Sequence, residues 1–399
     1  MSARVLILTA GFGEGHNAAA RALADGFARN AAPGTASIVD AFALASPRFN
    51  ALARRFYLKL INHAPGLWSR AYDWIDRSSF VQRRLWLFRR EIRVLAAVIA
   101  TERPTAICCT YPLYGFFLEQ IARAGGTVPP TYNVVTDSIS IHSLWWRAAC
   151  AGWFLPNEDS ADVMRRAGVY PTLIHVCGFP VPSFFAAQSA ILSPPEISPD
   201  STPRVLHIIN SGTRHAAETA RRLLSDTPWH VTFAVGRDEQ LQAKLRALAQ
   251  GRSAPVEILG WTNEIPRLLM THHVVVSKAG GATTQEAIAA LCPMIVSQVV
   301  PGQEEGNYEL LRRHRAGALA ETPDAVIAEL TRAFADRGRV WREWRAALRP
   351  LAQPDAAGDI ARHVLAATPQ NHTSVQPTMH PSPREAPMIS PRATLPKPI

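Results

Sequence analysis

The strongest constraint on the fold of this chain is a pattern that occurs twice: a short apolar run, a glycine-containing loop and an amphipathic stretch. Residues 4–10, RVLILTA, precede Gly-Phe-Gly-Glu-Gly-His, and an alanine-rich helical stretch follows at 17–28. Residues 204–210, RVLHIIN, repeat this order and are followed by Ser-Gly-Thr. A strand, a tight loop and a helix in succession are typical of βαβ units in a parallel sheet. The sequence therefore predicts an α/β protein built from two doubly wound units.

Further apolar runs predict the remaining strands of both units. They lie at 36–39, 105–110, 131–136, 152–156 and 173–177 in the first half, and at 231–235, 256–259, 273–277 and 294–298 in the second. Two successive doubly wound units predict a cleft between them, with ligands bound at the carboxyl ends of the strands.

Changes in composition predict the domain boundaries. Residues 186–203 are rich in proline and serine and show no hydrophobic periodicity, which indicates a linker. We therefore expect a first domain at 1–185 and a second domain at 204–366. The remaining residues, 367–399, predict a disordered tail, because they contain eight prolines and few apolar side chains.

The overall composition favours a globular cytosolic protein with an anionic partner. Lysine and arginine number 42 against 32 acidic residues, and this excess favours nucleic acid, an anionic membrane or a phosphorylated ligand. Five cysteines without a Cys-x-x-Cys pair argue against a disulfide framework or a zinc ribbon. We expect neither a signal peptide nor a membrane-spanning helix, because no apolar run approaches the ~20 residues that a bilayer needs.

The first glycine loop, at 11–16, has more than one interpretation. A dinucleotide-binding loop would need glycine at the sixth position, where this chain has His16, although Asp40 lies about where a ribose-binding acid would be. Alternatively, the glycines allow a tight turn and present His16 at a helix N-terminus, whose dipole lowers the pKa of the imidazole and leaves it able to accept a proton. The plain structural alternative is a histidine that only fixes the turn.

The second glycine loop follows the apolar run at 273–277 and opens a helix. Gly280 and Gly281 at a helix N-terminus would direct unpaired amides toward an anion such as a diphosphate. Glu286 is either part of a capping box with Thr283 or a carboxylate that accepts both hydroxyls of a ribose. The spacing fits both interpretations.

Two further loops carry polar groups at strand ends. Gln303, Glu304 and Asn307 offer donors and acceptors that suit a polyhydroxylated sugar, although acids in the first turn of a helix are also ordinary partners of the helix dipole. The loop from Trp261 to Ile265 would hold a uracil through backbone groups, or it is simply a loop with a core tryptophan.

Residues 48–93 contain 11 basic and three acidic residues, most of the positive excess of the chain, with aromatic residues among them. This pattern suits the interface of an anionic bilayer. The predicted membrane-binding residues are Arg83, Arg84, Trp86, Arg89 and Arg90. The alternatives are a solvated basic face whose aromatic residues belong to the core, and a nucleic-acid surface, for which no recognised motif is present.

These motifs, in this order, resemble those of the monogalactosyldiacylglycerol synthases and processive diacylglycerol glucosyltransferases, with the transferase that forms lipid II as a more distant relative. The matching segments are GFGEGHNAAA at 11–20, VVTDSISIHSLWW at 134–146, CGFPVPSFF at 177–185, SKAGGATTQEA at 277–287 and PGQEEGN at 301–307. The resemblance implies a GT-B fold, in which two Rossmann-like doubly wound domains face a cleft. The first domain would bind acceptor and membrane, and the second a nucleotide sugar.

The resemblance also implies roles for individual residues. His16 corresponds to the N-terminal histidine of the family, a candidate base, and Asp137 to the acid of its Thr-Asp pair, with His142 downstream. Gly280, Gly281 and Thr283 correspond to the diphosphate loop and Glu286 to the ribose ligand. The remaining nucleotide-sugar positions are Ser211, Gly212, Trp261, Ile265, Gln303, Glu304 and Asn307.

The expected activity is inverting transfer of a hexose from UDP-glucose or UDP-galactose to a membrane lipid, most simply the hydroxyl of diacylglycerol. No metal or other cofactor is expected, because the chain contains no Asp-x-Asp motif and helix-terminal amides can stabilise the leaving diphosphate. The expected location is the cytoplasmic face of a membrane, without nucleic acid as a partner. The alternatives are transfer of N-acetylglucosamine to a lipid-linked acceptor, epimerisation of a nucleotide sugar, and a non-catalytic protein that binds lipid or nucleotide on the same fold.

Overall fold

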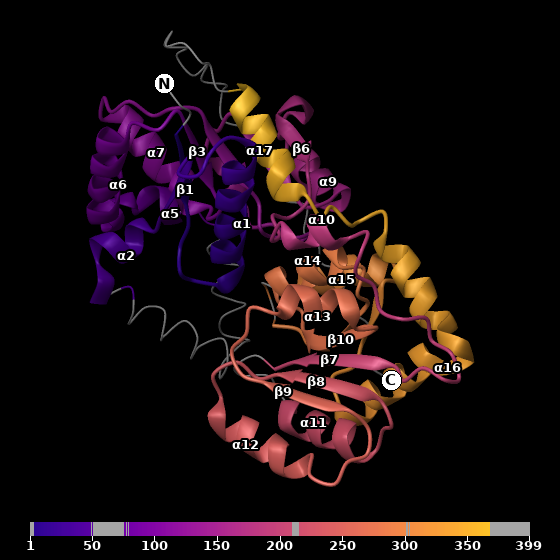
Figure 1. The fold of residues 1–399 in the computed structure, drawn as a ribbon. Helices are drawn as coiled ribbons and strands as arrows, with labels where there is room; N and C mark the ends of the chain where they lie inside the picture. The colour runs from indigo at the N-terminus through magenta and orange to yellow at the C-terminus, as the bar shows by residue number, and fades with distance from the viewer. Residues whose placement is uncertain are drawn as a thin grey trace.

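The computed structural model describes residues 4–48, 50, 76, 78, 80–209, 215–300, 302 and 304–367. Two parallel six-stranded sheets lie one after the other along the chain, each covered by helices (Figure 1). The strand order is β2-β1-β3-β4-β5-β6 in the first sheet and β12-β11-β10-β7-β8-β9 in the second. This confirms the predicted α/β class and the two doubly wound units.

The first sheet consists of β1 Val5–Leu8, β2 Ala36–Val39, β3 Ala106–Cys109, β4 Thr131–Val134, β5 Gly152–Leu155 and β6 Ile174–Val176. Its helices are α1 Glu14–Asn30, α2 Ala41–Ala45, α5 Phe80–Arg83, α6 Arg89–Glu102, α7 Leu113–Arg123, α8 Leu144–Arg147, α9 Glu158–Arg166 and α10 Phe184–Gln188, with the 3-10 turns η1 Leu85–Phe88 and η2 Pro171–Leu173. Four of these strands are entirely buried, which explains why they appear in the sequence as continuous apolar runs.

The second sheet consists of β7 Arg204–Ile208, β8 His230–Ala234, β9 Val256–Leu259, β10 Val274–Lys278, β11 Met294–Gln298 and β12 Gly317–Leu319. Its helices are α11 Ala216–Ser225, α12 Glu239–Leu248, α13 Ile265–Thr271, α14 Gly281–Ala289, α15 Glu305–Arg313 and α16 Pro323–Leu348, and the last described helix is α17 Ala356–Ala367. The short edge strand β12 is absent from the sequence prediction, because three residues are too few to form a recognisable strand pattern.

The end of the described chain crosses back to the first sheet (Figure 1). Ile360, Ala361 and Val364 of α17 pack in the same core as β1 and α1. Gly26 of α1 allows this approach, because a Cβ there would lie 2.5 Å from the carbonyl oxygen of Ala357. A single boundary at 204 therefore does not separate the two structural units, since a helix of the predicted segment 204–366 completes the first unit.

The predicted linker is packed rather than loose. Ile197 is buried in the core of the second unit, and the carbonyl oxygen of Pro195 lies 2.8 Å from Nε2 of His273. Proline and serine here produce irregular backbone, as expected, but the side chains still contribute to the second core.

Candidate active site

His16 lies in the first turn of α1, after the glycine loop that follows β1. Its Nδ1 is 2.7 Å from the carbonyl oxygen of Thr110 and 2.8 Å from the hydroxyl oxygen of Thr136. A carbonyl oxygen can only accept, so Nδ1 carries the proton and Nε2 of the neutral ring keeps its lone pair. The two contacts therefore fix both the tautomer and the orientation of the ring.

Burial lowers the pKa of His16 to about 4, and the hydrogen bond to Thr110 opposes this only in part. The sequence predicted a lowered pKa from the helix dipole, but desolvation is the largest cause. The consequence is the one expected: the imidazole is neutral at physiological pH and presents an acceptor nitrogen.

Asp137 follows Thr136 in the segment after β4. Trp145 donates from Nε1 to Oδ2 of Asp137 at 2.7 Å, and burial raises the pKa of this carboxyl although the Trp145 hydrogen bond and His142 oppose the rise. Within the described residues it is Thr136, not Asp137, that contacts His16 directly. In the Thr-Asp pair, Thr136 therefore bonds to His16, whereas Asp137 is bonded to Trp145.

The helix after the second glycine loop begins at Gly281, with Gly280 as its N-cap and no side-chain cap. Thr283 is therefore the third residue of the helix rather than its cap, so the capping-box interpretation of Thr283 and Glu286 is wrong. The glycine cap leaves the first amides of α14 without a side-chain acceptor, which is the arrangement predicted for an anion site.

Glu286 lies one turn further along α14. Burial raises the pKa of its carboxyl to about 7, an effect opposed by Arg21 and reinforced by Glu14, both from α1 of the first unit. Its carboxylate has no hydrogen-bond partner among the described residues. A partly buried carboxylate without a partner costs free energy, which a ligand that donates hydrogen bonds would offset.

Glu304 and Asn307 lie at the start of α15 and face the same loop. Glu304 accepts hydrogen bonds from Nζ of Lys278 and from the amide of Val300, the latter at 3.1 Å. Asn307 donates from Nδ2 to the carbonyl oxygen of Ala279 at 3.0 Å. Both side chains therefore support the glycine loop in this structure, whereas the sequence assigned them to a sugar.

The exposure of Trp261 rules out one of the two interpretations of its loop, that of a loop with a core tryptophan. The side chain is 64% exposed, so it is not a core tryptophan. Ile265 begins α13 and is half-buried against the core that includes α14. Three other predicted site residues, Ser211, Gly212 and Gln303, lie outside the described residues.

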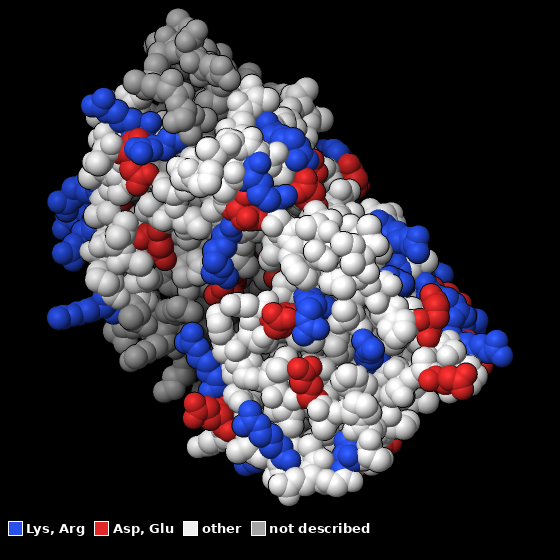
Figure 2. Space-filling model, viewed as in Figure 1, with Lys and Arg blue, Asp and Glu red and all other residues white. Residues whose placement is uncertain are grey.

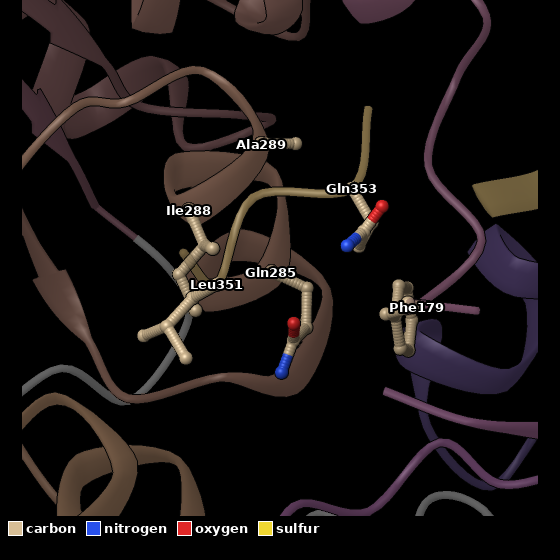
Figure 3. Close-up of a pocket in the computed structure, with 7 residues that line it drawn as sticks. Phe179, Gln285, Ile288, Ala289, Leu351 and Gln353 are labelled. Carbon is tan, nitrogen blue, oxygen red and sulfur yellow. The ribbon is translucent and has the colours of Figure 1, made fainter. Parts of the chain in front are cut away.

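The two units meet at these residues. A Cβ on Gly15 would lie 3.9 Å from the amide nitrogen of Ala282, and one on Gly281 would lie 3.8 Å from the carbonyl oxygen of Thr136. Beside them is a small pocket lined by residues of α14, of the segment after α16 and of the segment before α10: Gln285, Ile288, Ala289, Leu351, Gln353, Gly178 and Phe179 (Figure 3). The histidine and the helix N-terminus thus face each other across the interface.

A basic surface lies away from this interface. Arg83, Arg84, Arg89 and Arg90 are exposed, and Trp86 between them is 58% exposed. Basic side chains gather over α6 at the left edge of the molecule in Figure 2. Most of the remaining basic and aromatic stretch, 51–75, lies outside the described residues.

Two absences hold for the part of the chain that the structure describes. None of its helices is long and apolar enough to cross a membrane. No group of three or more His, Cys, Asp or Glu side chains is placed to hold a metal ion.

Comparison with known proteins supports the family read from the motifs. Residues 16–181 match the family model described as monogalactosyldiacylglycerol (MGDG) synthase. The predicted family resemblance is confirmed. The chain is also 24% identical over 366 residues to a processive diacylglycerol beta-glucosyltransferase of Bacillus cytotoxicus, covering 91% of this chain and 93% of the relative. The protein of the same name from Bacillus subtilis is 23% identical over 343 residues, 85% of this chain and 89% of the relative.

Solved structures confirm the GT-B fold. The chain is similar to S. aureus MnaA in its complex with UDP, with a TM-score of 0.58, 12% identity and coverage of 91% of this chain and 96% of the other. It is also similar to Acinetobacter baumannii MurG, with a TM-score of 0.56, 14% identity and coverage of 92% and 99%.

Sequence reasoning missed three residues of this arrangement. Thr110 acts through its carbonyl oxygen, which no side-chain pattern reveals, and Trp145 acts on Asp137 across eight positions of loop and helix. Lys278 was identifiable only as the residue before the glycine loop. A basic residue at the carboxyl end of a strand that precedes an anion-binding loop is the signal that would have found it.

Proposed function

We propose that this protein is an inverting glycosyltransferase that moves a hexose from UDP-glucose or UDP-galactose to the hydroxyl of a diacylglycerol-type lipid. The observation that carries the proposal is the position of His16 opposite the N-terminus of α14, as a neutral imidazole whose Nε2 has no hydrogen-bond partner among the residues that the structure describes. The similarity to enzymes named for diacylglycerol glucosyl transfer supports the choice of donor and acceptor.

The chemistry assigns one half of the reaction to each unit. Nε2 of His16 accepts the proton of the lipid hydroxyl as its oxygen attacks the anomeric carbon, and the bond from that carbon to the phosphate oxygen breaks. UDP leaves with the electron pair of that bond. A bound diphosphate would raise the pKa of His16 from about 4, because nearby negative charge favours the imidazolium form.

The second unit would bind the donor. Amides at the start of α14 would donate hydrogen bonds to the diphosphate, and the carboxylate of Glu286 would accept hydrogen bonds from the ribose hydroxyls. Stabilisation of the leaving charge by these amides makes a resident metal unnecessary in this mechanism. We therefore propose that the reaction proceeds without a metal or other cofactor.

Diacylglycerol resides in the bilayer, so the first unit must reach the membrane surface. Arg83, Arg84, Arg89 and Arg90, with Trp86 among them, would bind anionic headgroups at the cytoplasmic face. No role for nucleic acid follows from this surface.

The test is to incubate the protein with anionic vesicles that contain diacylglycerol and with labelled UDP-glucose, UDP-galactose or UDP-N-acetylglucosamine. The expected result is a labelled glycolipid formed from one of the two hexose donors. If a glycolipid forms only from UDP-N-acetylglucosamine, the donor is that nucleotide sugar and not a UDP-hexose. Conversion of UDP-N-acetylglucosamine in the absence of lipid would indicate an epimerase. Nucleotide binding without any product would indicate a non-catalytic protein.

A further inference from the structure

Lys278 is the last residue of β10, and its side chain lies beside the glycine loop. A Cβ built on Gly280 would lie 3.8 Å from Cε and 4.0 Å from Nζ of Lys278. The ammonium group therefore rests against the backbone of the residue that caps α14. Gly280 has no side chain, so no side-chain atom of this residue lies between the ammonium group and the N-terminus of α14.

The partner of Lys278 is Glu304, which is only 7% exposed. The second carboxylate oxygen of Glu304 accepts the amide of Val300, so the acid is held from two directions. Because both oxygens of this buried carboxylate are hydrogen-bonded, Glu304 holds the ammonium group of Lys278 in a fixed position. Glu304 thereby places a positive charge beside the amides of α14 even without a ligand.

A second, independent feature of this loop also indicates a ligand. Asn307 is 4% exposed, and while its Nδ2 is bonded to the carbonyl oxygen of Ala279, its Oδ1 has no hydrogen-bond partner in the part of the chain that the structure describes. Its Nδ2 lies 3.8 Å from the position of a Cβ on Gly281. A buried acceptor left unpaired beside the start of α14 is a cost that a ligand hydroxyl can offset.

We propose that Lys278 binds the diphosphate of the donor directly and neutralises the charge that develops on it as the sugar leaves, and that Glu304 is the residue that positions it. This inference rests on the proposed function, because it concerns the same donor site. The sequence motifs gave Lys278 no ligand contact, and they assigned Glu304 to the sugar. In this proposal Lys278 contacts the diphosphate and Glu304 contacts Lys278.

The charge balance supports this assignment. When the bond between the anomeric carbon and the phosphate oxygen breaks, the electron pair stays on the diphosphate, which gains one unit of negative charge. Helix-terminal amides supply about half a unit of positive charge at most. The ammonium group of Lys278, although paired with Glu304 on one side, adds N–H donors and a localised positive charge at the same place, where other sites use a metal ion.

The experiment compares the affinity of wild type and Lys278→Met for UDP and for uridine by calorimetry. Uridine keeps the base and ribose but has no phosphate. The expected result is a rise of at least tenfold in the Kd for UDP with an unchanged Kd for uridine. Lys278→Arg should keep the UDP affinity within about threefold, and Lys244→Met, an exposed lysine of α12, should change neither Kd.

Glu304→Gln separates a positioning role from a sugar contact. If Glu304 only positions Lys278, the Kd for UDP and the Kd for the UDP-hexose that wild type uses rise by the same factor. If Glu304 contacts the sugar, only the affinity for the UDP-hexose falls, and the second half of the proposal is overturned.

The remaining outcomes distinguish this inference from the proposed function. If wild type and Lys278→Met bind UDP equally well, the proposed role of Lys278 is overturned and the proposed function remains. Loss of both UDP and uridine in Lys278→Met means that the ion pair is structural, which also overturns the inference. Wild type that binds neither compound removes the nucleotide-sugar function itself.

Discussion

Gln285 of α14 donates a hydrogen bond from Nε2 to the hydroxyl of Ser138 at 2.8 Å, and so joins the second unit to the first at the mouth of the candidate site. Both side chains are buried. The carbonyl oxygen of Ser138 also lies against Gly306 of α15, where a Cβ would be 1.8 Å away. The residues after β4 therefore set how closely α14 and α15 approach His16.

Gly306→Ala should hold the two units apart while each still folds, because the added methyl group overlaps backbone of the opposite unit. We expect kcat/KM for transfer to fall roughly 100-fold, since a shift of about 1 Å in reacting groups has that effect. Ser138→Ala is the matched control, which removes one hydrogen bond worth about 1 kcal/mol without adding bulk. Equal activity of Gly306→Ala and wild type would contradict this role of the interface.

Glu286→Gln should weaken UDP binding without lowering thermal stability. The raised pKa of Glu286, about 7, exceeds the usual 4.5 of an unfolded chain, so ionising this carboxyl destabilises the fold as the pH rises through 7. The uncharged amide should therefore be at least as stable as wild type at pH 8. Calorimetric UDP binding and thermal unfolding on the same samples check this, and a less stable variant with full UDP affinity would exclude the ribose role.

His207 predicts a pH dependence of stability. It is 1% exposed in β7, its Nδ1 has no hydrogen-bond partner within the described ranges, and burial lowers its pKa to about 3. The unfolded chain takes up this proton near pH 6.5 but the folded chain does not, so stability is lost as the pH falls below 6.5. His207→Leu should reduce this slope by up to one proton, ~1.4 kcal/mol per pH unit, as measured by urea unfolding at pH 5 to 7. Parallel stability curves for variant and wild type would contradict the prediction.

Binding to anionic vesicles should depend on the basic surface around Trp86. Replacing Arg83, Arg84, Arg89 and Arg90 by Gln should abolish co-sedimentation at 0.1 M salt, and wild-type binding should fall steeply toward 1 M salt as the Debye length shrinks from ~10 Å to ~3 Å. The matched control replaces four exposed basic residues of the second unit, Arg221, Lys244, Arg246 and Arg339. Equal sedimentation of both quadruple variants would count against this surface.

The fold was predictable because its signals are local. Runs such as Val5–Leu8 are completely buried in parallel sheets, so hydrophobicity alone marks them. The glycine loops marked His16 and the start of α14 for the same reason, since a tight turn between strand and helix has a recognisable composition.

What the sequence could not supply were relationships across the chain. The carbonyl oxygen of Thr110 fixes the tautomer of a histidine 94 positions earlier, and the acid that anchors Lys278 lies 26 positions later. The return of α17 to the first unit depends on packing between Gly26 and Ala357, which neither residue reveals by itself. One of the two interpretations of the loop from Trp261 to Ile265 placed the tryptophan in the core, whereas the loop leaves its side chain exposed.

The central claim is that His16 accepts the proton of a lipid hydroxyl while the second unit binds the donor independently. The most direct measurement is glycolipid formation from labelled UDP-hexose in diacylglycerol vesicles by wild type and His16→Ala, with UDP affinity determined for both. The predicted result is a glycolipid product with wild type, a loss of about 10²- to 10⁴-fold in kcat with His16→Ala, and the same Kd for UDP. Wild-type turnover in His16→Ala would contradict the mechanism.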